Sequence, residues 1–170
     1  LAANVSASRD TIVFRAGLRG KISLNSALPA ITGKVSIQAL AAGQSTPSLQ
    51  IDFAGHAGLT FAQGSSGSSL IGLSLVKASG AALTLISDHN TIQDNYIGVD
   101  LDGQSALGNQ GNGITITGTS TGNLIGSTTP ADSTSWNTIV NVENRTYAVG
   151  SVQGIRSSTT DGDYILCGTG

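Results

Sequence analysis

The sequence predicts an all-β protein built as a solenoid, and composition, strand length and internal similarity support this prediction. Only 11% of the 170 residues are charged, with one glutamate and no methionine. Long helices draw on Ala, Leu, Glu, Lys and Arg together, so this composition argues against a helical bundle. It also argues against disorder, because 39% of the residues are hydrophobic and the net charge is -2.

Short strands are predicted along the chain because apolar and polar residues alternate, as in strands with one buried face. The predicted strands cover residues 11–14, 21–24, 35–39, 49–53, 58–61, 70–76, 82–86, 90–92, 95–97, 114–117, 123–125 and 137–140. They lie closer together than the strands of an antiparallel sandwich, and few hairpin turns separate them. We therefore expect coils of two or three short strands that stack in parallel.

Internal similarity gives the expected length of a coil. Ile71 and Ile92 occupy similar positions 21 residues apart, whereas Ile92 and Ile125 are 33 residues apart. The longer step predicts a loop of about ten extra residues within 99–112. Insertions of this kind gather on one face of a solenoid, where functional residues often lie.

Four asparagines stand where predicted strands begin, namely Asn90, Asn95, Asn123 and Asn137. Asparagine tolerates the backbone of tight corners, and its amide can bond to an asparagine of the next coil. We expect such ladders here. The alternative is that these amides bind sugar hydroxyls.

The charge balance excludes nucleic acid as a partner, since the chain has eight Lys and Arg residues and a pI of about 5.4. No uncharged apolar run of about 18 residues occurs, so membrane insertion by this segment is not expected either.

Several blocks in order carry a resemblance to a known family: DTIVF (10–14), ISLNSALPAI (22–31), NTIQDNYIGVD (90–100) and NLIGSTT (123–129). They resemble the right-handed parallel β-helix repeats of large bacterial secreted and surface proteins of the adhesin-like type. The resemblance covers about residues 1–130 and implies a truncated right-handed parallel β-helix from a longer, secreted or cell-surface chain.

The expected domain organisation is a parallel β-helix over residues 1–141. The usual continuation of the family pattern is missing after Ser127. Residues 142–170 are therefore expected to form a separate β segment. Its alternatives are a β-hairpin around the turn at 160–163 and the start of a second β domain.

Parallel β-helices host polysaccharide lyases and hydrolases, so carboxylates are the first candidates for catalysis. The densest group, and thus the candidates for catalysis, is Asp88, Asp94, Asp100 and Asp102. The polygalacturonase-like pair of adjacent aspartates is missing, as is the Gly-His-Gly that goes with it. We therefore assign no catalytic residue, and a non-enzymatic function is favoured.

The predicted insertion supplies the candidate binding loop, with Asp100, Asp102, Asn109 and Asn112 as its polar side chains. Asp100 and Asp102 are also candidate calcium ligands, because calcium takes clustered oxygen ligands. An EF-hand is excluded, since Ser105 stands in place of the required glycine. No cofactor is expected; calcium is the alternative.

These observations predict a non-catalytic structural or adhesin-like segment that presents loops for binding. The expected partners are a glycan or a host or cell-surface protein, together with the rest of its own longer chain. The alternative function is a carbohydrate-active enzyme or glycan-binding module on the same scaffold.

Overall fold

The described part of the chain consists of short strands and contains no helix. The computed structural model describes residues 8–15, 17–40, 43–117, 120–126, 137–139 and 152–153. The strands are β1 (Asp10–Val13), β2 (Gly20–Ser23), β3 (Val35–Gln38), β4 (Leu49–Asp52), β5 (Leu59–Phe61), β6 (Ser69–Ile71), β7 (Leu73–Val76), β8 (Leu83–Leu85), β9 (Thr91–Gln93), β10 (Tyr96–Ile97), β11 (Ile114–Ile116), β12 (Asn123–Ile125), β13 (Thr138–Ile139) and β14 (Val152–Gln153).

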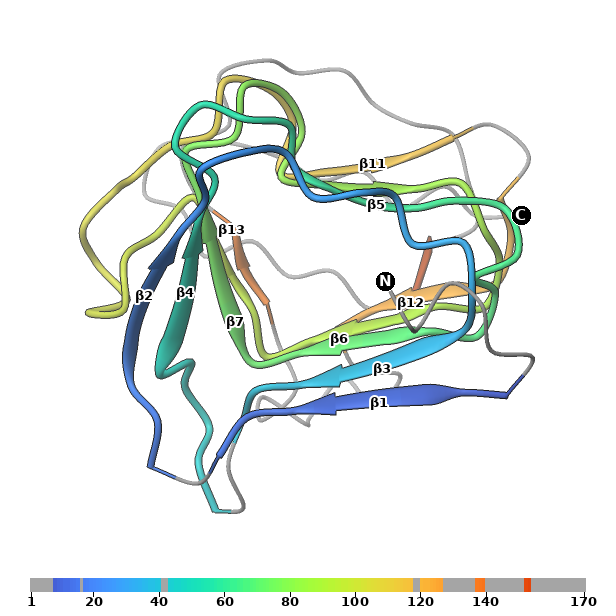
Figure 1. Ribbon diagram of the computed structural model, residues 1–170, viewed down its shortest axis with the longest axis horizontal. Coiled ribbons are helices and arrows are strands. Elements are labelled where there is room, and N and C mark those ends of the chain that lie inside the picture. The colour runs from blue at the N-terminus through green and yellow to red at the C-terminus, as the bar shows by residue number, and fades with distance from the viewer. Residues whose placement is uncertain are drawn as a thin grey trace.

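Three parallel sheets form the sides of a coil (Figure 1). Sheet A has the order β1-β3-β6-β9-β12-β14, sheet B the order β13-β10-β7-β4-β2, and sheet C the order β11-β8-β5. Neighbours in each sheet belong to successive coils, and every strand pair is parallel. Because sheet C has three strands, about three coils are complete on all three sides.

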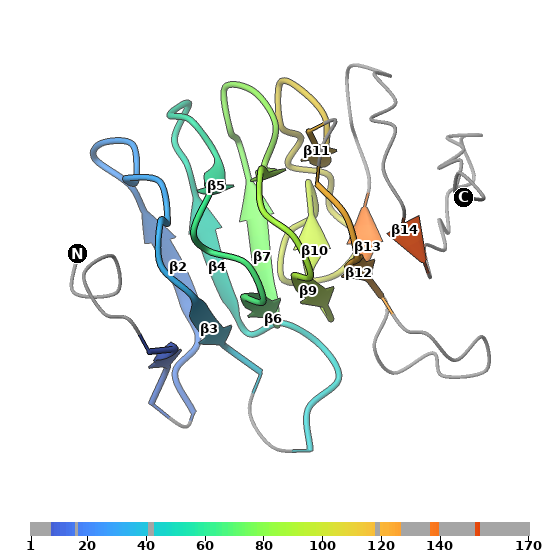
Figure 2. The ribbon, with the colours of Figure 1, turned by 90° about the vertical axis from the view of Figure 1, so that its right-hand side faces the viewer.

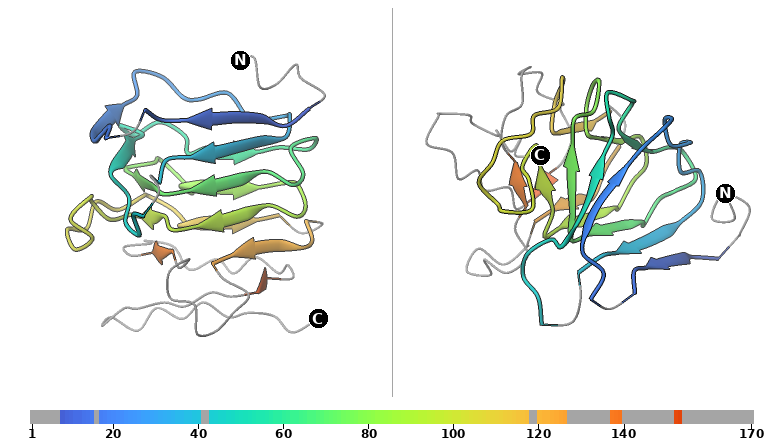
Figure 3. Two further views of the ribbon diagram at one scale, coloured as in Figure 1. Left: turned by 90° about the horizontal axis from the view of Figure 1, so that it is seen from below. Right: turned by 60° about the vertical axis from the view of Figure 1, so that its left-hand side comes forward.

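The coil is right-handed. The N-terminal strands lie nearest the viewer in Figure 1, and the chain runs clockwise as it recedes; Figures 2 and 3 show the coils stacked in order along this direction. This hand is the one expected for crossovers between parallel strands. The predicted all-β parallel β-helix is therefore confirmed.

The interior is filled by aliphatic side chains that stack from coil to coil. In sheet A one unbroken column runs through Ile12, Ile37, Leu70, Ile92 and Ile125, each paired with the next in register. The last four are buried. Each fully buried side chain of this size contributes about 1.5–3 kcal/mol by removal of apolar area from water.

The single strand predicted over residues 70–76 is wrong. The chain turns at Gly72, so that β6 lies in sheet A and β7 in sheet B. Gly72 has φ of +80°, and a Cβ there would lie 2.6 Å from Cβ of Leu40. The apolar pattern continues across this corner because Leu70 and Leu73 both point inward. The sequence pattern therefore does not indicate the boundary between β6 and β7. Ile71 and Ile92, which were predicted to occupy equivalent positions, are out of register by one residue, because Leu70 pairs with Ile92.

The predicted asparagine ladders are confirmed at two corners. Between sheets C and A, Asn123 Oδ1 accepts hydrogen bonds from Asn90 N and Asn90 Nδ2, both at 2.9 Å. Between sheets A and B, Asn137 Oδ1 accepts bonds from Asn95 N and Asn95 Nδ2, both at 3.0 Å. The amides thus supply acceptors for corner N–H groups that the sheets leave without a partner.

The first ladder continues toward the N-terminus through a serine. Ser68 N donates to Asn90 Oδ1 at 3.0 Å, and Val35 N donates to Ser68 Oγ at 2.9 Å. Each side chain in this ladder accepts a hydrogen bond from the backbone of the coil before it.

Sheet A gains its last described strand, β14, from beyond residue 141, where the sequence places the end of the β-helix. The hairpin expected around residues 160–163 lies outside the described residues.

We predict that Asn90→Ala lowers the free energy of unfolding by about 1–3 kcal/mol, because it leaves the buried Ser68 N–H without its acceptor. Urea unfolding followed by circular dichroism measures this change. Asn25→Ala, at an exposed position, is the control and should shift stability by less than about 0.5 kcal/mol. Equal effects of the two variants would contradict the role of the ladder.

Alanine substitutions at two glycines test how closely neighbouring coils approach each other. A Cβ at Gly58 would clash with the backbone oxygens of Ala81 and Ala82, whereas a Cβ at Gly80 has no atom within 4 Å. We expect Gly58→Ala to lower the melting temperature, at a cost of about 1–3 kcal/mol from overpacking. Gly80→Ala should cost less than about 1 kcal/mol or stabilise slightly. A thermal melt of both variants checks the difference.

Candidate functional site

The largest insertion in the described coils is the connection between β10 and β11, residues 98–113, called loop 98–113 below. It contains the predicted insertion at 99–112, whose existence is confirmed. The loop folds back on itself: Val99 bridges Ala106 in antiparallel fashion, and Asp100 N donates to Ser105 O at 2.8 Å. It projects from the coil on the side of β2 and β4 (Figure 1).

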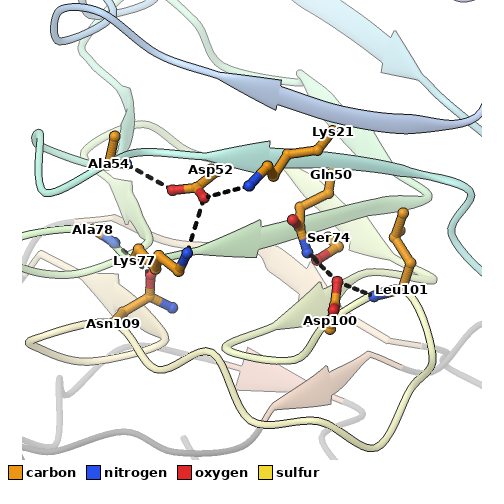
Figure 4. A network of polar contacts seen from close by, with 10 residues as sticks. All are labelled: Lys21, Gln50, Asp52, Ala54, Ser74, Lys77, Ala78, Asp100, Leu101 and Asn109. Atoms are coloured by element: carbon orange, nitrogen blue, oxygen red, sulfur yellow. Dashed lines mark hydrogen bonds and ion pairs between the residues drawn. The ribbon is translucent and has the colours of Figure 1, made fainter.

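The base of this loop covers the outer face of sheet B. Ser74 points outward from β7, yet it is completely buried, and its Oγ donates to Val99 O at 2.7 Å. Gln50, on the neighbouring β4, is also buried; its Nε2 donates to Ser74 Oγ at 3.2 Å and to Asp100 Oδ1 at 2.8 Å (Figure 4). The loop is therefore fastened to two strands of the sheet.

Asp100 and Asp102 have different positions in the loop. Asp100 accepts hydrogen bonds from Gln50 and from Leu101 N, so its carboxylate anchors the loop. Asp102 lies at the exposed tip, where it accepts bonds from Ser105 Oγ, Ser105 N and Gln104 N. These bonds, the one from the Ser105 hydroxyl foremost, lower the pKa of Asp102. Asp102 therefore holds the tip in a fixed turn.

The two predicted asparagines of the loop lie at its return to the coil. Asn109 is 2% exposed; its Oδ1 accepts a bond from Ala78 N at 2.8 Å, and its Nδ2 donates to Leu75 O at 3.3 Å. Asn112 is half-buried, and its Nδ2 donates to Thr115 Oγ1 at 3.2 Å. Both amides bind the protein itself, and Asn109 resembles the corner ladders in this respect.

Three of the four acidic residues that are dense in the sequence lie on different connections of the coil, while Asp102 shares loop 98–113 with Asp100. Asp88 lies at the corner between β8 and β9, Asp94 between β9 and β10, and Asp100 between β10 and β11. Their six-residue spacing matches one short strand and its corner, so the chain places each on a different corner of one coil. The carboxylate of Asp88 bonds to the following coil, where its Oδ1 accepts a hydrogen bond from Thr121 N at 2.8 Å.

Within the described residues, no group of three or more His, Cys, Asp or Glu side chains comes together that could hold a metal ion. Of the candidate calcium ligands, Asp100 accepts hydrogen bonds from Gln50 of sheet B and from Leu101 N, and Asp102 accepts hydrogen bonds from Gln104 N and Ser105 N of the loop.

A charged cluster that was not predicted from the sequence lies on the outer face of sheet B. Asp52 points outward from β4, but its side chain is only 6% exposed. Its Oδ2 lies 3.1 Å from Lys77 Nζ and 3.4 Å from Lys21 Nζ, and its Oδ1 accepts a bond from Ala54 N at 2.9 Å (Figure 4). Burial raises the pKa of Asp52, but the Ala54 amide and the two lysines together outweigh burial and lower it.

This cluster draws its members from three successive coils, since Lys21 belongs to β2, Asp52 to β4 and Lys77 follows β7. The three residues are widely separated in the chain, so no local motif marks them. The register of the strands brings them near one another, because Asp52 pairs with Ser23, two residues from Lys21, and with Val76, next to Lys77.

Comparison with family models, with curated proteins and with solved structures finds no match to this chain. Among the described residues there is no helix that could cross a membrane.

We predict that Asp52→Asn destabilises the fold at pH 7 by about 1–2 kcal/mol, because it weakens one hydrogen bond and removes the attraction to two half-exposed lysines. The folded-state pKa of Asp52 is lowered. Its charge therefore stabilises the fold above the ordinary aspartate pKa of about 3.9, and this stabilisation is lost as the pH falls through the folded-state pKa.

Urea unfolding at pH 7 and at a series of lower pH values measures this dependence. The difference between wild type and Asp52→Asn should shrink as the pH falls below about 4. Asp88→Asn is the control, because no ion pair of Asp88 with a lysine is formed among the described residues. A difference that stays constant down to acid pH would refute the assigned role of Asp52.

Proposed function

We propose that this chain is a non-catalytic structural segment of a secreted or cell-surface bacterial protein, and that it presents the tip of loop 98–113 for binding. One observation carries the proposal. The base of the loop is fixed to sheet B by buried hydrogen bonds, while its tip residues Asp102, Gln104, Ser105 and Ala106 are exposed.

A fixed loop on a rigid scaffold suits binding, because little conformational freedom is lost when a partner is engaged. The base is held by Gln50, Ser74 and Asn109, and the turn at the tip is held by Asp102. The tip is therefore ordered before any partner arrives.

The chemistry of the tip fits a surface glycan. It offers a carboxylate, an amide and a hydroxyl, which can exchange hydrogen bonds with sugar hydroxyls. Tyr96 points outward beneath the loop, and a Cβ at Gly103 would lie 3.0 Å from Tyr96 Oη. The ring thus supports the tip from below. A cell-surface protein with a polar epitope would use the same groups.

The arrangement of acids argues against hydrolysis of glycosides. That reaction needs two carboxyl groups about 5–9.5 Å apart on either side of one bond. Asp88, Asp94 and Asp100 stand on different connections of the coil. Asp102 shares the loop with Asp100, but Asp100 is engaged by Gln50 and Asp102 by Gln104 N and Ser105 N. No observation favours the enzyme alternative over binding.

A glycan array tests the proposal directly. We expect the purified chain to bind a subset of immobilised glycans and Gln104→Arg to weaken that binding at least tenfold, because it places a long charged side chain at the tip. Gln63→Arg is the matched control, since Gln63 is exposed at the corner between sheets C and A, and it should bind like wild type.

The same preparation should release no sugar from a panel of neutral and acidic polysaccharides. Binding that is insensitive to Gln104→Arg would exclude the tip as the binding surface. Release of reducing ends or unsaturated sugars that is abolished by Asp88→Asn or Asp94→Asn would replace the proposal with the enzyme alternative.

A further inference from the structure

The outer face of sheet A carries a column of hydroxyl side chains. The interior column of this sheet is buried, so the residues that alternate with it point away from the core. One outward column is in register over four strands and consists of Thr11, Ser36, Ser69 and Thr91. Ser36 Oγ and Ser69 Oγ lie 2.8 Å apart and share a hydrogen bond. In Figure 3, left, this face is turned toward the viewer, and β1, β3, β6 and β9 lie one below the other.

A second outward column runs beside the hydroxyl column and is also uncharged. It consists of Val13, Gln38, Ile71 and Gln93, which pair in register. Gln93 Nε2 donates to Gly126 O at 2.8 Å, which aligns this amide with the axis of the coils. The middle of the face therefore offers hydroxyl and amide groups.

Basic side chains border the hydroxyl column at the corner with sheet C. Arg9, Lys34 and His89 each stand two residues before a member of that column, and all three are exposed. Glycines hold the equivalent positions on the intervening strands. A Cβ at Gly67 would lie 3.0 Å from Lys34 Nζ, and a Cβ at Gly122 would lie 2.7 Å from His89 Cδ2. The side chains of Lys34 and His89 thus extend along the coil axis, each over the glycine of the following coil.

These basic groups are not neutralised by the protein. Within the described residues both ion pairs belong to Asp52, on sheet B. Arg9 Nη2 donates to a backbone oxygen, that of Gly67, at 2.8 Å. The acidic residue of this corner, Asp88, accepts a bond from Thr121 N. The basic column is therefore available to an anionic group from outside the chain.

We propose that the outer face of sheet A binds an acidic polysaccharide, one chain of which lies along the axis of the β-helix. Its carboxylates lie against Lys34 and His89, and its hydroxyl groups exchange hydrogen bonds with the hydroxyl and glutamine side chains. Lys34 and His89 are two strands apart, about 10 Å along the axis. An extended polysaccharide whose sugars alternate in orientation presents the carboxylate of every second sugar on one side, which suits donors two strands apart.

The chemistry of the face favours this partner over nucleic acid and over a lipid bilayer. Nucleic acid binds through many phosphate contacts, whereas this face carries few cations. A bilayer takes up an apolar face, whereas this one is mainly hydroxyl and amide. The surface is separate from loop 98–113, so the two proposals stand or fall independently.

Titration calorimetry with polygalacturonate tests the class of ligand, with the fully methyl-esterified polymer as the uncharged control. We expect polygalacturonate to bind, to bind more weakly as salt is added, and to bind at least tenfold more tightly than the ester. Because the net charge of the chain is -2, attraction to a polyanion has to come from a local surface. Absence of polygalacturonate binding at low salt, equal binding of the ester, or binding of anionic phospholipid vesicles in its place overturns the proposal.

Two matched pairs of variants locate the surface. Lys34→Gln should weaken polygalacturonate binding at least fivefold, whereas Gln110→Glu, which changes the net charge equally at an exposed position of loop 98–113, should weaken it less than twofold. Thr91→Val removes a hydroxyl and keeps the branched shape, and it should weaken binding about threefold. Thr84→Val makes the same change on the outer face of sheet C and should have no effect.

A variant of the loop tip separates this surface from the one proposed above. Gln104→Ala should leave polygalacturonate binding unchanged, and circular dichroism confirms the fold of each variant. Equal losses from Lys34→Gln and Gln110→Glu would show unspecific attraction of charge, and a loss from Gln104→Ala would assign the polymer to the loop tip. Either result overturns the proposal.

Discussion

Successive coils must form their backbone hydrogen bonds and stack their interior side chains in the same register, and the rest of the fold follows from this requirement. The column Ile37, Leu70, Ile92 and Ile125 meets this constraint, although the steps between its members differ in length. Extra residues are therefore placed in the connections between strands, as in the 16 residues of loop 98–113 between β10 and β11. The connections can therefore differ in length, whereas the strands must keep their register.

The corners create a second requirement, since the backbone turns there and its N–H groups lose their sheet partners. The ladder through Ser68, Asn90 and Asn123 supplies the missing acceptors with side chains from the following coil. Asn109 does the same for Ala78 at the base of loop 98–113. A short polar side chain at a corner is thus as much a part of the stacking as an aliphatic residue in the interior.

The loop extends this principle to the outside of the coil. Outward positions on a solenoid strand are ordinarily exposed, yet Ser74 and Gln50 are buried because loop 98–113 lies over them and uses their hydrogen-bonding groups. Polar groups that are buried and satisfied hold a structure in one arrangement. The same arrangement separates an inner set of anchoring residues from an exposed tip, which is the basis for proposing a binding function.

Local sequence patterns predicted the alternating strands, the asparagine corners and the position of the long insertion, because each of these features follows from residues within one coil. Which side chains meet across coils depends on the folded arrangement. It separated Asp88, Asp94 and Asp100, which are near one another in the chain, onto three corners. It also brought Lys21, Asp52 and Lys77 together from three coils. In a solenoid, residues that are a few positions apart lie on different sides of one coil, whereas residues one whole coil apart lie side by side. Residues that are close in space are therefore separated in the sequence by about the length of a coil.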